Sequence, residues 1–457
     1  MSLYSFIQKF HFSQAPFATR QCLLNCLLDI LGVAAGAQGN QTSRLLREYA
    51  SEHYPTNKLS SRLLFDGRQV HPLGAAWAGG FCIDSLDGHE GHFTSKGHAG
   101  ATVVPALLAL ADAYHQQGHQ ISGEEFLTAL CIGYESALRA GTALMATAPE
   151  YHASGAFSGI GVVCGGARLL GLDEDTFRHA LGIAEYFGPR CPMMRLVDYP
   201  SMLRDAHGAG AYAGINALLL AKAGITGAPA ETIESSAVAG HWHDLGERWE
   251  INSQYFKPWP VCRWAQPALT AATFLRDQHP DITVNNIESI RVETFHESMR
   301  LQGHAPANAD EAQYGLAFPL AALLCRGQVG PAEVTGEAIH AADILALSQR
   351  IDIVEMDDLS RRFPEEILSR VHIRLKDGRI FSSDTTAAKG DPAIPITATE
   401  LLDKFHHMAA ASLTILHRQA IVQQIAELID SPNCALLFDL ILNNVQIPHE
   451  GATSCVA

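Results

Sequence analysis

Residues 83–112 read IDSLDGHEGHFTSKGHAGATVVPALLALAD, a polar half followed by an apolar half. The polar half holds three acids, three histidines and a lysine within fifteen residues, and glycines separate them. This glycine spacing predicts a loop. The apolar half, from Ala101 onward, predicts a helix in which Pro105 is tolerated only in the first turn. Because the N–H groups at a helix start favour anions, the loop and the helix start together form the first candidate site.

Two other interpretations of this loop are open from the residues alone. Glycine-spaced polar residues before a helix are often a solvated connection. The histidines also suggest zinc, but the spacings His89-x2-His92 and His92-x5-His98 are not those of familiar zinc motifs, and no HExxH occurs. Since the chain has 22 histidines, chance clusters are common. We therefore expect no metal site here.

Length and charge limit the class of protein. A chain of 457 residues exceeds one ordinary core, so two domains are expected. The 32 basic and 48 acidic residues give a net charge of -16, which argues against nucleic acid and anionic membranes as partners. No secretory signal is evident, and charged residues interrupt the apolar runs, so we expect a cytoplasmic protein without membrane spans. Ten scattered cysteines without a CxxC pair indicate reduced thiols.

The hydrophobic pattern changes once along the chain. Residues 18–223 show helical spacing, and the glycine patterns around Gly159 and Gly208 favour close helix packing over a nucleotide loop because neither is GxGxxG. After Pro267 strand patterns appear. Residues 371–375 alternate between apolar and polar, and the turn signal at 377–378 predicts a hairpin. Helical patterning returns from residue 398 to residue 442.

The order Asp84-x2-Asp87, then Gly97-His98, then a Val-Val-Pro-Ala helix resembles the signature of the MmgE/PrpD family. The resemblance implies a mainly α fold with a large all-helical domain built from both chain ends, residues 1–267 with 398–457. It also implies a smaller α+β lid domain, residues 268–397, and a homodimer formed by the helical domain.

Four further stretches are similar to motifs of the same family. They are YHASG (151–155), PSMLRDAHG (200–208), KPWPVCRWAQP (257–267) and AQYGLAF (312–318). Without the resemblance, His152 reads as a surface-loop residue and the third stretch as a domain junction. Gly88 and Gln266 stand where the family usually has threonine and histidine, which puts the particular substrate in doubt.

The resemblance implies a set of site residues. The catalytic residues it implies are His98, His152, Asp84, Asp87 and Tyr314. The substrate-binding residues it implies are Lys257, Arg204, Arg263, His89 and Gln266. We expect both histidines of the first set in one pocket, with one of them as the base and the aspartates orienting it. Lys257 and Arg204 are expected to hold a substrate carboxylate.

Family members include 2-methylcitrate dehydratase, cis-aconitate decarboxylase and iminodisuccinate epimerase. The resemblance therefore implies a cofactor-independent lyase of the dehydratase type, acting on a small di- or tricarboxylic acid. Fixed cations, not a metal or redox cofactor, are expected to stabilise the charge that develops next to the carboxylate. An epimerase, a decarboxylase and a non-catalytic carboxylate binder remain as alternatives.

Overall fold

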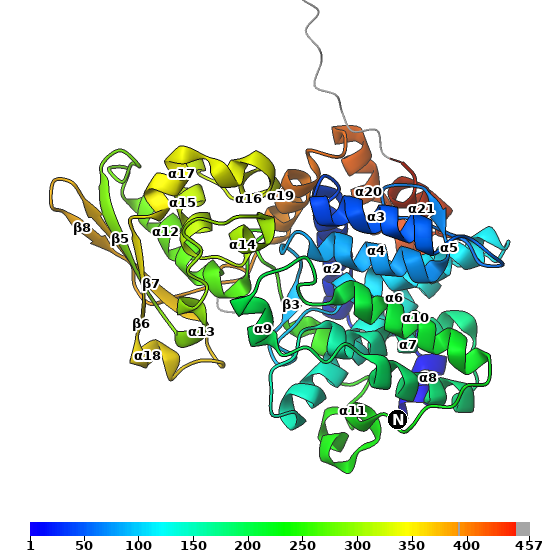
Figure 1. The fold of residues 1–457 in the computed structure, drawn as a ribbon. Coiled ribbons are helices and arrows are strands. Elements are labelled where there is room, and N and C mark those ends of the chain that lie inside the picture. Colours follow the sequence, from blue (N-terminus) through cyan, green and yellow to red (C-terminus); the bar gives the residue numbers. More distant parts are fainter. Residues whose placement is uncertain (392–393, 445–457) are drawn as a thin grey trace, which may run out of the picture.

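The computed structural model describes residues 1–391 and 394–444, which form two lobes (Figure 1). The fold is mainly α-helical, as the sequence predicts. Long helices make up the larger lobe, and the smaller lobe contains the main sheet with short helices around it (Figure 1).

The long helices of the larger lobe pack closely through small residues. These helices are α2 (Phe17–Gly36), α3 (Gln41–His53), α4 (Pro72–Asp84), α5 (Gly100–Gln116), α6 (Gly123–Thr147), α7 (Gly155–Leu170), α8 (Glu174–Phe187) and α10 (His207–Lys222). A Cβ atom at Gly161 in α7 would lie 2.2 Å from the carbonyl oxygen of Gly133 in α6. One at Gly214 in α10 would lie 2.5 Å from the Cβ of Val162. These glycines therefore serve helix packing, as the sequence predicts.

The last helices of the chain return to the larger lobe. They are α19 (Ala398–Ala409), α20 (Ile415–Glu427) and α21 (Ala435–Leu442). Lys404 of α19 donates a hydrogen bond to Asp29 of α2 at 2.5 Å, and the Phe65 amide donates to the Ile441 carbonyl at 2.7 Å. Both ends of the chain thus contribute to this lobe. The boundaries at 267 and 397 stay a prediction, and residues 445–457 lie outside the described residues.

The sheet of the smaller lobe has the strand order β6-β5-β7-β8, with β9 also paired to β7. Its strands are β5 (Ile287–Thr294), β6 (Ile351–Glu355), β7 (Leu368–Leu375), β8 (Ile380–Ser382) and β9 (Thr386–Ala387). Strands β5 and β6 are parallel, and the other pairs are antiparallel. Ile373 lies opposite Phe381, and Gly378 has a φ of +90° in the turn. The predicted hairpin is confirmed.

Shorter elements complete the two lobes. In the larger lobe and its loops they are α1 (Leu3–Lys9), α9 (Met193–Asp198), α11 (Glu231–Glu234), β1 (Ser61–Arg62), β2 (Gln69–Val70), β3 (Gly91–His92) and β4 (Gln254–Tyr255). In the smaller lobe they are α12 (Gln266–Gln278), α13 (His296–Met299), α14 (Ala309–Gln313), α15 (Ala317–Arg326), α16 (Pro331–Val334), α17 (Ala342–Ser348) and α18 (Asp357–Ser360).

Pro105 differs from its predicted position. Helix α5 begins at Gly100, so the proline lies beyond the first turn and not within it. A Cβ atom at Gly79 in α4 would lie 2.7 Å from the Pro105 Cβ. The proline ring therefore packs tightly against α4, and tertiary packing offsets its poor fit to a helix interior.

Helix α2 is the one helix of the described ranges that is long and apolar enough to cross a membrane. Within the protein, 56% of an 18-residue apolar stretch of this helix is buried. The buried Asp29 near the centre of the helix pairs with Lys404. A core helix has these properties as well.

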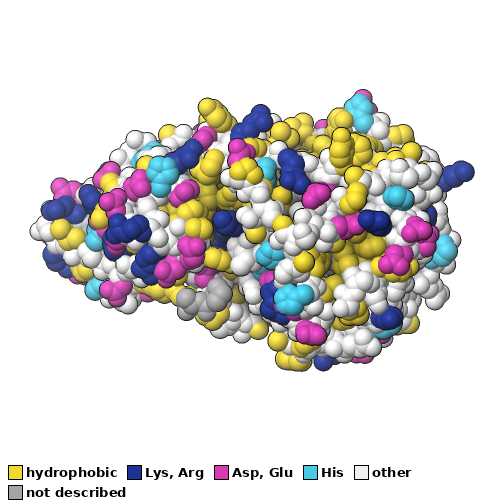
Figure 2. Space-filling model, turned by 90° about the horizontal axis from the view of Figure 1, so that it is seen from below, with side chains coloured by type: hydrophobic (Ala, Val, Ile, Leu, Met, Phe, Trp, Pro, Cys, Tyr) yellow, Lys and Arg dark blue, Asp and Glu magenta, His cyan; other side chains and the backbone are white. Residues whose placement is uncertain are grey.

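The surface differs between the lobes. Seen from below, charged side chains crowd the smaller lobe, whereas wide apolar areas lie over the larger lobe (Figure 2). Most of the exposed large hydrophobic side chains belong to the larger lobe, among them Tyr186 and Tyr199. Apolar surface of this kind is frequently covered by a partner.

Candidate active site

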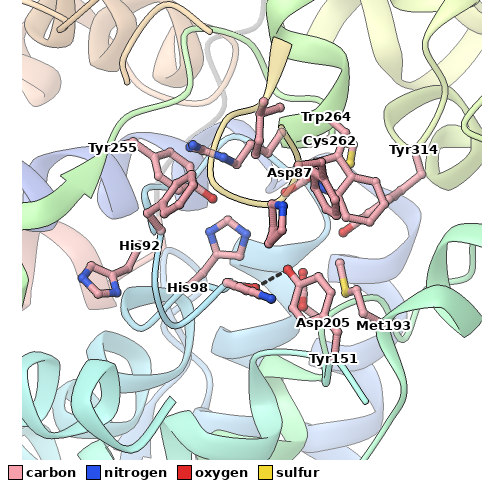
Figure 3. Close-up of a pocket in the computed structure, with 16 residues that line it drawn as sticks. Asp87, His92, His98, Tyr151, Met193, Asp205, Tyr255, Cys262, Trp264 and Tyr314 are labelled. Carbon is pink, nitrogen blue, oxygen red and sulfur yellow. Dashed lines mark hydrogen bonds between the residues drawn. The ribbon is translucent and has the colours of Figure 1, made fainter. Parts of the chain in front are cut away.

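A cavity of about 50 Å³ lies between the two lobes. Its walls come from the loop between α4 and α5, from the segments before α7 and α10, from β4 and its following loop, and from the smaller lobe. The lining residues are Asp87, His92, Phe93, Lys96, His98, Tyr151, Met193, Asp205, Tyr255, Cys262, Arg263, Trp264, Tyr314, Phe363, Pro364 and Ile367. Figure 3 shows this cavity in close-up.

The loop of residues 85–99 is packed inside the protein and is not a solvated connection. Glu90 and His92 are fully buried, and β3 pairs with β4. A Cβ atom at Gly91 would lie 2.2 Å from the hydroxyl oxygen of Tyr255, and one at Gly97 would lie 2.6 Å from the Ser154 hydroxyl oxygen. Both glycines are therefore required for close approach, which brings the polar side chains of the loop to the cavity.

His98 has the arrangement of a base with a fixed tautomer. Its Nδ1 lies 2.5 Å from the Glu90 carbonyl oxygen, which can only accept. Nδ1 must therefore carry the hydrogen, which leaves a lone pair on Nε2. Burial, helped by the charge of Lys257, lowers the pKa of His98 to about 4. The ring is consequently neutral near pH 7.

Asp87 and Lys257 form a buried ion pair at the cavity wall. The Lys257 ammonium donates to the Asp87 carboxylate, and the Asp87 amide donates to the Gln313 side chain at 2.8 Å. Burial acts to raise the pKa of Asp87, but the charge and hydrogen bond of Lys257, together with neighbouring positive groups such as Arg204, outweigh it, so this pKa is lowered. Asp87 therefore stays ionised.

Behind His98 lies a buried cluster made by Asp84, His89 and His207. Neither carboxylate oxygen of Asp84 has a hydrogen-bond partner among the described residues, nor have the Nε2 atoms of His89 and His207. The His89 Nε2 lies 3.8 Å from an Asp84 oxygen, and the His207 Nδ1 lies 2.8 Å from the Thr102 hydroxyl oxygen. Burial, and then the charge of Asp205, raises the pKa of Asp84 well above its usual value. Burial lowers the pKa of His89.

Two groups of side chains here have ligand atoms close enough to hold a metal ion. In each group the ligand atoms lie within 4.8 Å of one another, and the groups are Asp84 with His89 and His207, and Asp87 with His89 and His98. Nitrogen and carboxylate ligands suit zinc. However, Lys257 already pairs with Asp87, and the Arg204 guanidinium donates to the Asp84 carbonyl at 2.8 Å. A metal in the second group would have to share Asp87 with Lys257, and one in the first group would lie close to the Arg204 guanidinium.

The predicted carboxylate-binding cations differ in position. Arg263 lines the cavity, lies 3.4 Å from the ring centre of Tyr255 and pairs with Asp391 at 2.9 Å. Arg204 does not line the cavity. It pairs with Asp310 at 2.7 Å and so connects the segment before α10 to α14.

Two domain models of one protein family together match most of the chain. The model of the MmgE/PrpD N-terminal domain matches residues 1–251, and that of the MmgE/PrpD C-terminal domain matches residues 259–428. The chain belongs to the MmgE/PrpD family. It is 24% identical to the cis-aconitate decarboxylase-like protein oryM of Aspergillus oryzae over 94% of both chains. It is 22% identical to the cis-aconitate decarboxylase of Aspergillus terreus over 77% of both chains.

The structure brings eight of the ten site residues expected from the MmgE/PrpD motifs to the cavity or directly behind it. Those that line the cavity are His98, Asp87, Tyr314 and Arg263. Four residues lie behind it. Lys257 contacts Asp87, and Arg204 lies 5.7 Å from the Tyr314 ring centre. The His89 ring lies 4.5 Å from the His98 ring, and its Nε2 lies 3.8 Å from an Asp84 carboxylate oxygen.

His152 and Gln266 are placed elsewhere. His152 forms an isolated β-bridge with Pro192, and its neighbour Tyr151 lines the cavity instead. Successive side chains of an extended segment point to opposite sides, so Tyr151 faces the cavity and His152 does not. The expectation that His98 and His152 share one pocket is not met. The Gln266 amide donates to the carbonyls of Trp259 and Val261, which makes it a support for that loop.

Several lining residues were not selected from the sequence. Asp205 lies in the 200–208 motif, and Lys96 lies in the opening stretch, so both were within quoted motifs. His207 lies behind the cavity, with its ring 5.2 Å from that of His89, and it belongs to the same 200–208 motif. Trp264 lies in the 257–267 motif and was not selected, whereas Tyr255 lies outside the quoted motifs. Single aromatic residues are as common in a core as in a site, so neither was singled out.

Proposed function

We propose that the protein is an enzyme of the lyase type, which removes a proton from the carbon next to a carboxylate of a small hydroxy acid and eliminates water. The observation that carries this proposal is the fixed tautomer of His98, whose Nδ1 bonds to Glu90 and whose Nε2 has no hydrogen bond among the described residues. A neutral imidazole at a cavity wall is suited to accept a proton.

Charge develops on the substrate carboxylate as the proton leaves. Lys96 and Arg263 line the cavity and supply positive charge without needing to reorganise. The Lys257 ammonium pairs with Asp87 and so offsets the negative charge that this carboxylate would otherwise place at the cavity wall. These residues belong to the chain itself, so the proposed step uses no cofactor.

Tyr314 is the proposed acid. Its hydroxyl is buried and has no hydrogen-bond partner within the described residues, and it lines the cavity from the smaller lobe. Burial, and then the charge of Asp87, raises its pKa well above the usual value, so the hydroxyl stays protonated. It can therefore donate to the hydroxyl group that leaves.

Decarboxylation is the second candidate, because the relatives from Aspergillus oryzae and Aspergillus terreus are named cis-aconitate decarboxylase-like and cis-aconitate decarboxylase. The same cations would stabilise the carbanion left by loss of carbon dioxide. Identities of 22% and 24% support a related chemistry and leave the substrate open.

Proton NMR in heavy water separates the candidates. Hydroxy acids and their unsaturated products are incubated with the protein and with His98→Asn. A dehydratase interconverts the two, a decarboxylase releases carbon dioxide, an epimerase only exchanges the proton, and a binder does none of these. Elimination that is lost in the variant is the expected result. Exchange or binding without elimination would contradict the proposed reaction.

A further inference from the structure

We propose that Asp205 is a positioning residue for His98, which holds the main chain of this histidine through the Ser154 hydroxyl and places an unpaired negative charge in the cavity. This inference rests on the proposed function, in which His98 accepts the proton. Asp205 lies within the 200–208 motif, but the resemblance implies no role for it.

Asp205 lies on a strained segment just before helix α10. Its side chain lines the cavity together with that of His98, and the residue is only 3% exposed (Figure 3). The residues on both sides of it, Arg204 and Ala206, have φ values of 43° and 57°. Residues other than glycine rarely adopt this left-handed conformation, and such strain is typical of functional sites. The contact with α7 holds the segment in place, because the Gly155 amide donates to the Asp205 carbonyl at 2.8 Å.

The Asp205 carboxylate is linked to His98 by a single hydroxyl group. One carboxylate oxygen accepts from the Ser154 amide at 3.0 Å and from the Ser154 hydroxyl at 3.1 Å. Because a hydroxyl has one hydrogen, its oxygen is left to accept, and the His98 amide donates to it at 3.0 Å. Asp205 thus sets the orientation of the group that holds the His98 main chain.

His98 is held from two sides. The Glu90 carbonyl holds its ring, and the Ser154 hydroxyl holds its amide. The neighbouring Gly97 leaves room for this contact, because a Cβ atom there would lie 2.6 Å from the Ser154 hydroxyl oxygen. The ring and the main chain of the base are therefore both fixed before a substrate enters, as a preorganised proton acceptor requires.

The charge of Asp205 differs from that of the other acid that lines the cavity, Asp87. Asp87 pairs with Lys257, whereas no cation within the described part of the chain pairs with Asp205. When His98 accepts a proton its ring becomes positive, and Asp205 is the carboxylate whose charge is free to stabilise it. In agreement with this role, burial and the charge of Lys257 lower the pKa of His98, and the charge of Asp205 opposes them.

A helix cap is the alternative role for Asp205, since its carboxylate accepts from the Ser154 amide at the start of α7. A neutral acceptor serves as a cap about as well as a carboxylate does, whereas only a carboxylate can stabilise a positive ring. The variant Asp205→Asn separates the two roles, because asparagine keeps the acceptor oxygen for Ser154 and loses the charge.

Steady-state kinetics on a hydroxy acid that the protein turns over tests the inference. Asp205→Asn should lower kcat by roughly ten- to a hundredfold with KM within about threefold of the wild type, because the charge acts on the protonated base and not on the bound substrate. Ser154→Ala, which removes the link to the His98 amide, should also lower kcat. Melting temperatures of both variants report folding. A wild-type kcat in Asp205→Asn would leave only the helix cap and overturn the inference.

The matched control is Asp173→Asn. Asp173 accepts from the Thr176 amide at 2.8 Å at the start of α8, so this variant makes the same chemical change at another helix start. It should leave kcat unchanged. A loss of kcat equal to that of Asp205→Asn would mean that the effect is not specific to the cavity, which would also overturn the inference.

A double variant tests whether Asp205 acts through His98. Adding Asp205→Asn to His98→Asn should cause no further loss of kcat, because the base that the charge serves is already gone. Additive losses would mean that Asp205 acts independently of His98. That result would overturn the inference and leave the proposed function intact.

If no acid is turned over, the proposed function fails, and hydrogen exchange still decides whether Asp205 holds His98. The His98 amide should exchange slowly in the wild type and in Asp205→Asn. In Ser154→Ala and Asp205→Ala it should exchange at least about tenfold faster, because its acceptor is lost or no longer oriented. The Gly100 amide, which donates to the Glu90 side chain at 3.0 Å, is the internal reference. Equal protection of the His98 amide in Asp205→Ala and the wild type would overturn the inference.

Discussion

The Nδ1 atom of His98 lies 2.5 Å from the carbonyl oxygen of Glu90, so the backbone eight residues earlier in the same loop sets the tautomer of the candidate base. The Glu90 side chain is also fixed, because its carboxylate accepts from the Gly100 amide at 3.0 Å. The start of helix α5 thus holds Glu90, and Glu90 holds His98.

Replacing His98 by asparagine should lower kcat/KM by about 10²- to 10⁴-fold, the usual contribution of a general base. Asparagine keeps a donor near the position of Nδ1 and lacks the basic Nε2. Initial rates and heavy-water exchange on the preferred acid measure the effect, and the melting temperature of the same variant reports folding. Activity within a factor of a few of the wild type would exclude His98 as the base.

The pH dependence of stability should depend on His98. Burial lowers its pKa to about 4, while an unfolded histidine has a pKa near 6.5. As the pH falls below 6.5, the unfolded chain takes up a proton that the folded protein does not, so the free energy of unfolding decreases until about pH 4. One such proton corresponds to about 1.4 kcal/mol per pH unit.

Chemical unfolding of the wild type and His98→Asn between pH 6 and 4 measures the contribution of His98 to the pH dependence of the free energy of unfolding. Buried Asp84 and Glu90, whose pKa values are raised, act in the opposite sense, and the comparison cancels them. The free energy of unfolding of the variant should fall less steeply with falling pH, and the difference in slope should correspond to about one proton. Parallel curves would mean that His98 is not buried in its neutral form.

The sequence predicted the helical fold, the hairpin and the site loop, because each has a local signal. Residues 371–381 carry both the alternation and the turn residues of a hairpin. The loop before α5 carries its polar residues within one short stretch of the sequence. A single local pattern was therefore enough to predict that this loop belongs to the site.

What the sequence could not give is the direction of individual side chains and their partners. Tyr151 and His152 are neighbours, and the residue that faces the cavity depends on the bridge to Pro192. From the sequence, Lys257 was expected to bind a carboxylate of the substrate. In the structure it pairs with Asp87, which lies 170 residues away in the sequence. Neither relationship leaves a local pattern.

Lys257→Ala tests the role of this lysine. If Lys257 binds a substrate carboxylate, the variant should bind substrate about ten- to a hundredfold more weakly. Its melting temperature should then stay close to that of the wild type. The buried pair with Asp87 leads us to expect a loss of stability, because the variant leaves a buried carboxylate unpaired, at a cost of about 3–5 kcal/mol. Melting temperature and ligand binding are measured on the same variant.

The matched control for this prediction is the double variant Lys257→Met with Asp87→Asn. Removing both charges should recover most of the stability lost in the single variant. A single variant that melts normally and binds its ligand weakly would show that the lysine acts mainly on the substrate.

Activity should survive chelation, because Lys257 and Arg204 already supply positive charge next to both groups of possible metal ligands. The protein is dialysed against a strong chelator and assayed, and its metal content is measured before and after. The expected result is unchanged turnover and melting temperature. Loss of either, restored by a single divalent ion, would assign a metal to the cluster of Asp84, His89 and His207.

The protein should form a homodimer through its larger lobe. Exposed apolar side chains concentrate there, and Tyr186 at the end of α8 is 81% exposed. Burying such surface against a second copy is favourable, and a two-fold dimer is the commonest arrangement. Light scattering at micromolar concentration should give twice the chain mass of 49.3 kDa. Tyr186→Glu should weaken the dimer, whereas Ile380→Glu, at a 52% exposed position on the smaller lobe, should not. A monomeric wild type would exclude the dimer, and dissociation by the Ile380 variant alone would move the interface to the smaller lobe.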